Sequence, residues 1–408
     1  MVTYPKDWTS AEITEYVDIY QGGTPKTSVA QYWGGSIIWV TPSEITQNGS
    51  MYIHNSVRKI TEQGLHNSSA CLLPIGTILL CTRATIGELS IAESAMTTNQ
   101  GFKNLVCKSN ADNVFFAYLL KTKKDEMIAR AIGSTFLELS KKELSKFRVT
   151  VPDVTEQKLI AETLSYIDTH IANLTELIEK KKGIRDGALE DLVSGRTRLK
   201  GFSGKRENVT FNSVITPKAR IGWQGLKKHE YLISGYSYLI GGTDFYHGTV
   251  SLSNISYVSK ERYDMDTNIQ VAANDVLVTK DGTIGKVVIV PPLSKPATLN
   301  SGVFVFRTTN RLTPPFLYRV LSSSVFRKFI DALSAGSTIK HLYQKDLKKF
   351  EFNIPKDVDE QKAIVEVLSS LDAEIASLEE EKDKMLQIKA GAMDDLLTGR
   401  VRLTRQGG

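Results

Sequence analysis

Cysteine and long apolar segments are both scarce in this sequence. Its 408 residues include only three cysteines, Cys71, Cys81 and Cys107, and none of them belongs to a Cys-x-x-Cys pair. An odd number of cysteines without paired spacing is typical of reduced thiols in a cytoplasmic protein. No apolar run reaches the roughly 18 to 20 residues that cross a bilayer, and the opening residues, MVTYPKDW, lack the regions of a signal peptide. We therefore expect a soluble cytoplasmic protein.

Recognisable catalytic and metal-binding motifs are also missing. The six histidines have no ligand-like spacing, and there is no P-loop, nucleophile elbow or Cys/His pair. Pro152-Asp153 with Glu156-Gln157-Lys158 resembles a compressed nuclease signature, but this spacing at a helix start cannot make two carboxylates converge on a metal ion. Thr313-Pro314-Pro315-Phe316 resembles an amino-methyltransferase motif, but threonine has no side-chain carbonyl to accept a bond from a base. We therefore expect a binding protein with no catalytic residue, metal or cofactor of its own.

An internal repeat is the most informative feature that the sequence does have. Residues 153–199 align without a gap to residues 357–403, with 24 identities in 47 positions. The longer segments repeat more loosely, as Thr85-Ile86-Gly87 is matched by Thr283-Ile284-Gly285. Repeats of this kind indicate duplicated structural units. The sequence predicts four parts, namely a domain over 1–152, a long helix over 153–198, a second domain over 199–355, and a second long helix with a tail over 356–408.

Positive charge is concentrated in the two long segments. Residues 1–152 carry 15 basic and 13 acidic side chains, a net charge of +2, whereas residues 201–355 carry 20 and 11, a net charge of +9. Residues 153–200 and 356–408 have net charges of −1 and −4. Basic segments favour a polyanion as ligand, because lysine and arginine neutralise phosphates and release counterions. The long segments are therefore the candidates for nucleic-acid binding.

Both short segments have the pattern of a long helix with a heptad seam. Asp153 and Asp357 are expected to cap the helices, and Glu156 and Glu360 to complete a capping box. Apolar residues then recur at alternating steps of four and three, which predicts that the helices pack against each other. The predicted packing residues are Ile160, Leu164, Ile167, Ile171, Leu174 and Leu192 in the first helix, and Ile364, Leu368, Leu371, Ile375, Leu378 and Leu396 in the second.

Roughly 42 helical residues would form a rod of about 60 Å. The heptad pattern does not decide whether the two rods run parallel or antiparallel. An alternative is that they act only as spacers between the domains. Gly187 and Gly391 recur at the same place inside the helices, where glycine is unfavourable. We expect them to mark a close backbone contact, and a frayed helix end is the alternative.

Each long segment is predicted to form an α+β domain with a twisted sheet and helices. Short apolar runs are separated by Gly, Pro, Asn and Ser turns, and an apolar helix pattern follows near residues 114–131 or 315–333. The strand-like runs are Ser36–Val40 and Gly76–Thr82 in the first segment, and Val276–Thr279, Lys286–Val290 and Val303–Arg307 in the second.

Polar loops at matching places in the two domains are the candidate DNA contacts. Ser, Thr, Asn and Lys at loop tips suit phosphates, and Arg, Asn and Gln suit base edges. The small residues Gly22 and Gly23 are expected to let the backbone approach a ligand. For any single residue, a solvated turn is the alternative. The candidates are Lys26, Arg83, Thr85, Asn99, Ser134, Thr135, Arg220, Lys227, Lys228, Lys280, Thr283, Ser337, Thr338 and Lys340.

The order of these parts resembles the type I restriction enzyme specificity subunit. The resemblance covers the whole chain, and its strongest element is the pair of Glu-Gln-Lys helices, which end in Leu-Val-Ser-Gly-Arg (192–196) and Leu-Leu-Thr-Gly-Arg (396–400). In addition, Gly22-Gly23-Thr24-Pro25 followed by Trp39-Val40-Thr41-Pro42 is similar to the opening of many target recognition domains of that family.

The resemblance implies a specific function. Each target recognition domain would read one half of a split sequence in double-stranded DNA. The two helices would pack as an antiparallel coiled coil, related by an internal pseudo-twofold repeat, and would set the spacer between the halves. Two methyltransferase subunits would bind the chain, and two restriction subunits would join them. S-adenosylmethionine, Mg²⁺ and ATP would then belong to those partners. An enzyme with an unrecognised active site and a scaffold that binds only protein are the alternatives.

Overall fold

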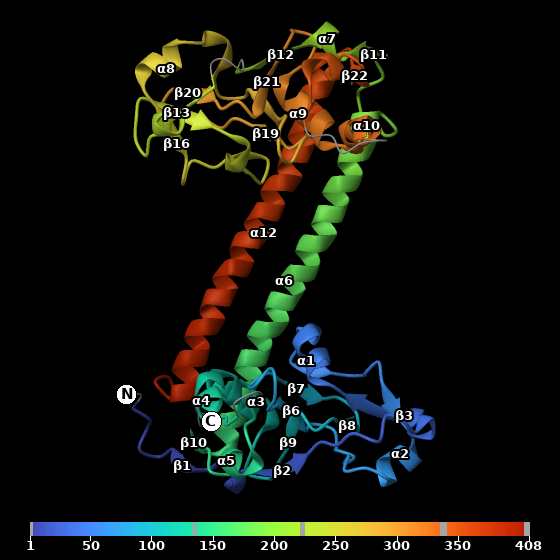
Figure 1. Ribbon diagram of the computed structural model, residues 1–408, viewed down its shortest axis with the longest axis vertical. Coiled ribbons are helices and arrows are strands. Elements are labelled where there is room, and N and C mark those ends of the chain that lie inside the picture. The colour runs from blue at the N-terminus through green and yellow to red at the C-terminus, as the bar shows by residue number, and fades with distance from the viewer. Residues whose placement is uncertain (1–2, 134–136, 221–224, 335–340, 404–408) are drawn as a thin grey trace. The chain divides into compact units, whose positions relative to one another are not determined.

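The computed structural model describes residues 3–133, 137–220, 225–334 and 341–403. The chain divides into two compact units, labelled by element in Figure 1. Unit 1 contains Met1–Thr175 and Glu380–Gly408, and unit 2 contains Glu176–Glu379. Each unit therefore holds one of the long segments together with half of each long helix. Within the described residues, no helix is long and apolar enough to span a membrane.

The two predicted long helices are present. They are α6 (Val154–Ser194) and α12 (Val358–Thr398), and each has 41 residues. Asp153 caps α6, because its Oδ1 accepts hydrogen bonds from the backbone N–H groups of Thr155 and Glu156. Both helices end at a glycine in the left-handed region, Gly195 with φ +79° and Gly399 with φ +73°, where a residue with a side chain would be strained.

The described part of unit 1 contains short strands and five short α-helices besides its share of the long helices. Its strands form a five-stranded sheet in the order β2-β9-β6-β7-β4, a three-stranded sheet β5-β3-β8 and the pair β1-β10. The strands are β1 (Thr9–Glu12), β2 (Val17–Gln21), β3 (Trp33–Val40), β4 (Tyr52–Ile53), β5 (Lys59–Ile60), β6 (Ile78–Cys81), β7 (Leu89–Ala92), β8 (Thr97–Thr98), β9 (Phe102–Cys107) and β10 (Arg148–Val151). The helices are α1 (Pro42–Asn48), α2 (Glu62–His66), α3 (Asn113–Thr122), α4 (Lys124–Ala129) and α5 (Lys141–Ser145).

The described residues of unit 2 have the same plan with two added strands. Its sheets have the orders β12-β21-β18-β19-β15-β14, β16-β13-β20-β17 and β11-β22. The strands are β11 (Arg206–Thr210), β12 (Ile215–Ala219), β13 (Ser237–Ile240), β14 (Phe245–Tyr246), β15 (Thr249–Val250), β16 (Ser256–Val258), β17 (Gln270–Val271), β18 (Val276–Thr279), β19 (Val287–Ile289), β20 (Ala297–Leu299), β21 (Val303–Thr308) and β22 (Glu351–Pro355). The helices are α7 (Phe211–Val214), α8 (Lys260–Asp264), α9 (Pro314–Ser322), α10 (Ser324–Ser334) and α11 (Gln344–Leu347). The loose sequence repeat thus corresponds to a repeated strand order, in a mixed α and β fold.

The central strand of each large sheet is buried on both faces. In unit 1, Ile78 and Leu80 of β6 pack into one core with the helix α3, and Leu79 packs into a second core. In unit 2, Val276 and Val278 belong to one core and Leu277 to another. This arrangement explains why these runs are continuously apolar rather than alternating.

The ends of the helix seams also belong to the domain cores. Ile160, Leu164 and Leu396 are buried in the main core of unit 1, and Leu192, Ile364 and Leu368 in that of unit 2. The middle of the seam is less enclosed, since Ile167, Leu174 and Ile375 are buried but Ile171, Leu371 and Leu378 are half-buried. The predicted packing residues therefore also anchor each domain on its helices.

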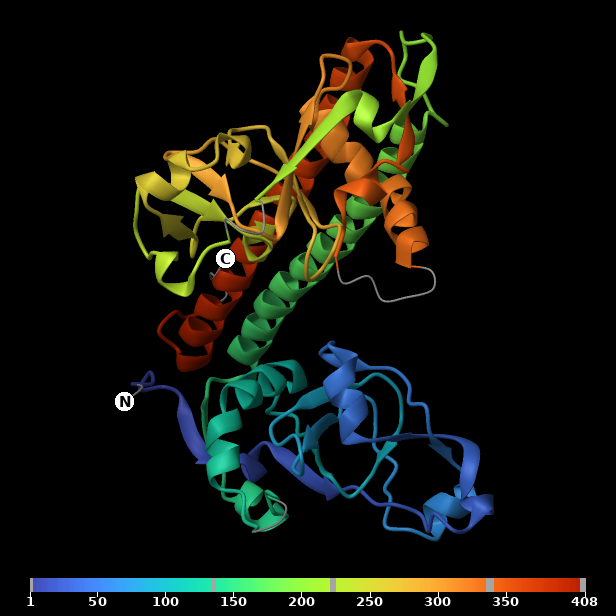
Figure 2. The same ribbon diagram turned by 45° about the horizontal axis from the view of Figure 1, so that its top comes forward.

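The paired helix segments run in opposite directions within each unit. In unit 1, Asp168 pairs with Lys389 and His170 lies 3.5 Å from Glu381. In unit 2, Lys181 pairs with Glu374 and Arg185 with Asp372. Residue numbers rise along one helix as they fall along the other, and the two helices lie side by side in both views of unit 2 (Figure 1 and Figure 2).

The prediction of a close backbone contact at Gly187 and Gly391 is wrong. Both residues are exposed, and among the described residues a Cβ added at either would meet nothing within 4 Å.

Candidate nucleic-acid interface

Three loops meet at one place in unit 1, which we call the unit 1 junction. They are the hairpin loop between β6 and β7, the turn before β9, and the segment before α5. The backbone N–H of Thr82 donates to Gly101 at 2.8 Å, and that of Leu139 donates to Thr82 at 3.0 Å. Of the predicted contacts, Arg83, Thr85 and Asn99 lie at this junction.

The unit 2 junction repeats this geometry. The backbone N–H of Lys280 donates to Gly302 at 2.9 Å, and that of Leu342 donates to Lys280 at 2.8 Å. These three residues occupy the places of Thr82, Gly101 and Leu139 in unit 1. The predicted contacts Lys280 and Thr283 lie here. The same backbone frame therefore carries different side chains in the two units.

The asparagines of the two junctions shape their turns. Asn99 Oδ1 accepts from the backbone N–H of Gly101 at 2.8 Å. In unit 2, Asn300 Oδ1 accepts from the backbone of Ser301 at 2.7 Å and from the Tyr231 hydroxyl at 3.3 Å. Asn300 and Tyr231 were not among the predicted candidates. The repeat of Asn99-Gln100-Gly101 in Asn300-Ser301-Gly302 was the signal that could have identified Asn300.

The glycines Gly22 and Gly23 contact the chain itself, so the prediction that they admit a ligand is wrong. A Cβ added at Gly22 would lie 1.9 Å from the Asn99 carbonyl oxygen, and one added at Gly23 would lie 2.3 Å from the backbone of Ala70. The Gly23 carbonyl also accepts from the indole of Trp39 at 2.8 Å. These glycines allow close packing inside the first domain.

Arg220 is also buried and stabilises the fold, and it does not lie on the surface. It is 3% exposed, and its Nε donates to the Leu299 carbonyl at 2.9 Å. It follows β12 as Gly22 follows β2, and it packs at the equivalent turn. Burial lowers the pKa of this guanidinium. The prediction that Arg220 contacts DNA is therefore wrong for this conformation.

The remaining candidates divide into two groups. Lys26, Lys227 and Lys228 are exposed, and no described contact connects their side chains to a junction. Ser134, Thr135, Ser337, Thr338 and Lys340 lie outside the described residues.

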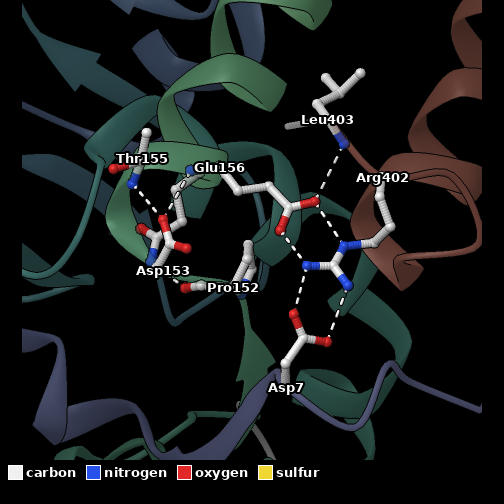
Figure 3. Close-up of polar contacts among 8 residues, drawn as sticks. Asp7, Pro152, Asp153, Thr155, Glu156, Arg402 and Leu403 are labelled. Carbon is white, nitrogen blue, oxygen red and sulfur yellow. Dashed lines mark hydrogen bonds and ion pairs between the residues drawn. The ribbon is translucent and has the colours of Figure 1, made fainter. Parts of the chain in front are cut away.

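The duplicated helix motifs form a second set of contacts, which we call the clasps. In unit 1, Arg402 donates to both carboxylate oxygens of Glu156 at 2.8 Å and to both of Asp7 at 2.9 and 2.7 Å (Figure 3). The backbone N–H of Leu403 also donates to Glu156 at 3.2 Å. These hydrogen bonds, first from Glu156 and then from Asp7, raise the pKa of Arg402. Glu156 therefore binds the tail of the other helix, and the capping-box prediction is wrong for it.

The unit 2 clasp uses the equivalent pair. Arg198 donates to Glu360 at 2.5 Å, and Arg206 lies 3.7 Å from the other oxygen of that carboxylate. Glu360 is almost completely buried, and it does not complete a capping box. Arg206 also donates to the last carbonyls of α6, those of Leu192 and Val193. Each clasp thus ties the tail after one helix to the start of the other.

The glutamine of each Glu-Gln-Lys motif fixes the domain to its helix. Gln157 is fully buried; its Oε1 accepts from the backbone of Asp112, which caps α3, and its Nε2 donates to Pro152. Gln361 makes the same contacts to Thr313 and Pro355. The repeated glutamine therefore sets where each domain helix begins.

A carboxylate in the middle of each helix joins three elements, and we call these contacts the nodes. Asp168 accepts from the Tyr118 hydroxyl of α3 at 2.6 Å and pairs with Lys389 of α12 at 2.5 Å. At the equivalent place in unit 2, Asp372 accepts from Arg319 of α9 at 2.6 Å and from Arg185 of α6 at 2.9 Å. One carboxylate therefore fixes both the domain and the opposite helix.

Known proteins have similar sequences. The family described as type I restriction modification DNA specificity domain matches residues 5–181 and 226–387. The MjaIX specificity subunit of Methanocaldococcus jannaschii, a type I restriction enzyme subunit, is 36% identical over 225 residues, which are 54% of this chain and 50% of that protein. The MjaVIII specificity subunit of the same organism is 23% identical over 98% of this chain and 94% of its own length.

A solved structure has the same fold. The S subunit of a type I restriction-modification system from M. genitalium superposes with a TM-score of 0.60 at 17% sequence identity, and the match covers 97% of each chain.

Proposed function

Since the chain belongs to the family of type I restriction-modification DNA specificity subunits, we propose that each of its two domains reads one half of a split target in double-stranded DNA. The observation that carries this proposal is the pair of junctions. They share a backbone frame but carry different side chains, as expected of two readers with different half-sites. The basic charge of the long segments supports contact with phosphates.

The two long helices set the distance between the two DNA-reading domains, and we call the paired helices the ruler. In each unit the paired segments run in opposite directions, and the clasps, glutamines and nodes recur 204 residues apart. These contacts support an antiparallel coiled coil with internal pseudo-twofold symmetry. A straight helix of 41 residues is about 60 Å long, which exceeds the roughly 34 to 36 Å of one DNA turn. The division into two recognition domains, 1–152 and 199–355, and two helices, 153–198 and 356–408, follows from the same proposal.

The helices also dock two copies of one partner. Within the helices, seven positions are both exposed and identical in the two copies. At about 100° per residue they all fall within about 120° of the helix circumference. A face that stays identical while its surroundings diverge is expected when both copies bind the same protein. The seven are Lys158, Glu162, Ala172, Glu176, Lys180, Ile184 and Gly187, with their counterparts Lys362, Glu366, Ala376, Glu380, Lys384, Ile388 and Gly391.

The partner on each face is a methyltransferase subunit, and two restriction subunits complete the complex. The chain itself is non-catalytic, and S-adenosylmethionine, Mg²⁺ and ATP bind to the partner subunits. The complex is proposed to work in the cytoplasm.

Selection from a random DNA pool tests this function. The full chain is mixed with its methyltransferase subunits, and retained DNA is sequenced. We expect one enriched motif with two specified halves and an unspecified spacer of fixed length. The absence of any split motif would contradict DNA reading. Methyl transfer or DNA cleavage by the purified chain alone, with labelled S-adenosylmethionine and Mg²⁺, would contradict the non-catalytic role.

A further inference from the structure

A side-chain pair with one acidic member bridges two loops in each junction, and the acidic member lies on opposite loops in the two units. In unit 1 the cation is on the hairpin loop, where Arg83 donates to Glu138 of the segment before α5 at 2.7 and 2.5 Å. In unit 2 the anion is on the hairpin loop, where Asp281 contacts the imidazole of His341. Both residue pairs also form an isolated antiparallel bridge between the same two loops. They therefore occupy equivalent places.

The unit 1 pair is reinforced from inside the domain. Lys103 of β9 is 1% exposed and lies 3.1 Å from the second carboxylate oxygen of Glu138. Burial raises the pKa of Glu138, but the hydrogen bonds from Arg83 and Lys103 outweigh it and hold that pKa below its usual value. Glu138 is thus an ionised bridge between two cations, and an exposed loop is tied through it to the central sheet.

The exchanged positions of the acidic residue distinguish between two possible roles for Arg83, a phosphate contact and a contact that joins two loops. A cation that binds a DNA phosphate could not be replaced by Asp281 at the equivalent place, since a carboxylate repels phosphate. A cation that holds two loops together can be replaced, provided that its partner changes from Glu138 to His341. The two domains differ in this way, because both members of the pair change together.

We propose that Arg83–Glu138 and Asp281–His341 are latches that hold the reading loops of each domain in place. The inference rests on the proposed DNA-reading function. The four residues are positioning residues, because they act on DNA through the loops that they join. Thr283, which follows Asp281 on its hairpin loop, is an exposed side chain that the unit 2 latch orients, whereas the hydroxyl of Thr85 on the unit 1 hairpin loop is buried.

The test compares Arg83→Ala, Glu138→Ala and the double variant by the same DNA selection, with methyltransferase subunits present. Each single variant is expected to lower base selectivity about tenfold, or about 1.4 kcal/mol, at one half-site only. The double variant is expected to be no worse than either single variant, because both remove the same interaction. Asp281→Ala and His341→Ala are expected to act on the other half-site.

Matched variants guard against a general loss of folding. Glu126→Ala breaks the Arg130–Glu126 pair at the end of α4, which is 2.8 Å long and half-exposed but joins no loops; it is expected to leave both half-sites unchanged. Glu138→Ala leaves the buried Lys103 without its carboxylate, which could destabilise the domain. The double variant Lys103→Met with Glu138→Gln therefore removes the carboxylate charge of the latch without leaving a buried unpaired cation.

The outcomes are distinguishable. If Arg83→Ala weakens binding to all sequences and Glu138→Ala strengthens it, Arg83 contacts phosphate and the latch is overturned. If the wild-type chain selects a split motif and the latch variants select it equally well, the latch is overturned but DNA reading stands. If the wild-type chain selects no split motif, the proposed function itself fails.

Discussion

The two clasps use an equivalent glutamate and arginine, but the additional charged residue beside the pair is acidic in one clasp and basic in the other. In unit 1, one guanidinium, Arg402, holds two carboxylates, Glu156 and Asp7. In unit 2, one carboxylate, Glu360, lies between two guanidinium groups, Arg198 and Arg206. The shared pair belongs to the repeated helices, whereas Asp7 and Arg206 come from the segments that enter the diverged domains. The comparison teaches that the helix ends kept a common contact while each domain adjusted its charge around it.

The largest difference between the units is expected when the clasp glutamates are neutralised. Glu360→Gln leaves Arg198 and the largely buried Arg206 facing each other, and we expect a loss of about 3 kcal/mol in the free energy of unfolding. Glu156→Gln leaves Arg402 paired with Asp7, and we expect a loss of about 1 kcal/mol. Denaturant unfolding of both variants and the wild type measures the two losses in the free energy of unfolding. Equal losses would show that the surroundings do not matter, and a larger loss for Glu156→Gln would contradict the charge argument.

The nodes are expected to show the same asymmetry more weakly. Asp372→Asn removes the charge between two guanidinium groups, Arg319 and Arg185, with an expected loss of about 2 kcal/mol. Asp168→Asn leaves a neutral phenol and one lysine, with an expected loss of about 1 kcal/mol. The reversed order, measured by the same unfolding experiment, would refute the charge argument. Lys384→Ala, which breaks an exposed pair with Glu380 within one helix, serves as the control.

The two docking faces are expected to behave alike, in contrast to the clasps. Ile184→Asp and Ile388→Asp each place a charge on one face, and each is expected to weaken one of two methyltransferase sites about tenfold. The number of bound subunits, measured by light scattering at limiting concentration, is expected to fall from two to one. Leu177→Asp changes an exposed residue that differs from its counterpart Glu381 and serves as the control. Loss of both subunits in one single variant would contradict two equivalent sites.

Acid is expected to weaken the unit 1 latch. The pKa of Glu138 lies below its usual value of 4.5, so its ionised form stabilises the fold above about pH 4.5. That contribution is lost as the pH falls through the lowered value. The difference in unfolding free energy between the wild type and Glu138→Gln is therefore expected to be constant from pH 7 to about pH 5 and to shrink below that. A difference that grows on acidification would contradict the assignment.

The sequence was sufficient to predict the two long helices, because heptads and caps are local patterns. It was not sufficient for the clasps. Glu156 fits a capping box three residues from Asp153, and its true partner, Arg402, lies 246 residues away. The only signal was that both residues persist in both copies. Arg220 looked like a surface cation because its burial depends on strands that pair far along the chain. The latches were missed because the acidic residue and its partner exchange places between the domains, so no sequence match connects them.

Two DNA-reading domains are held apart by the paired helices in the arrangement that we propose, and lengthening both helices tests it most directly. Seven helical residues are inserted after Thr175 and seven after Glu379, positions that face each other if the helices pair as proposed. We predict that DNA selection with the methyltransferase subunits returns the same two half-sites, with a spacer longer by up to about three base pairs. Altered half-sites with an unchanged spacer would contradict it.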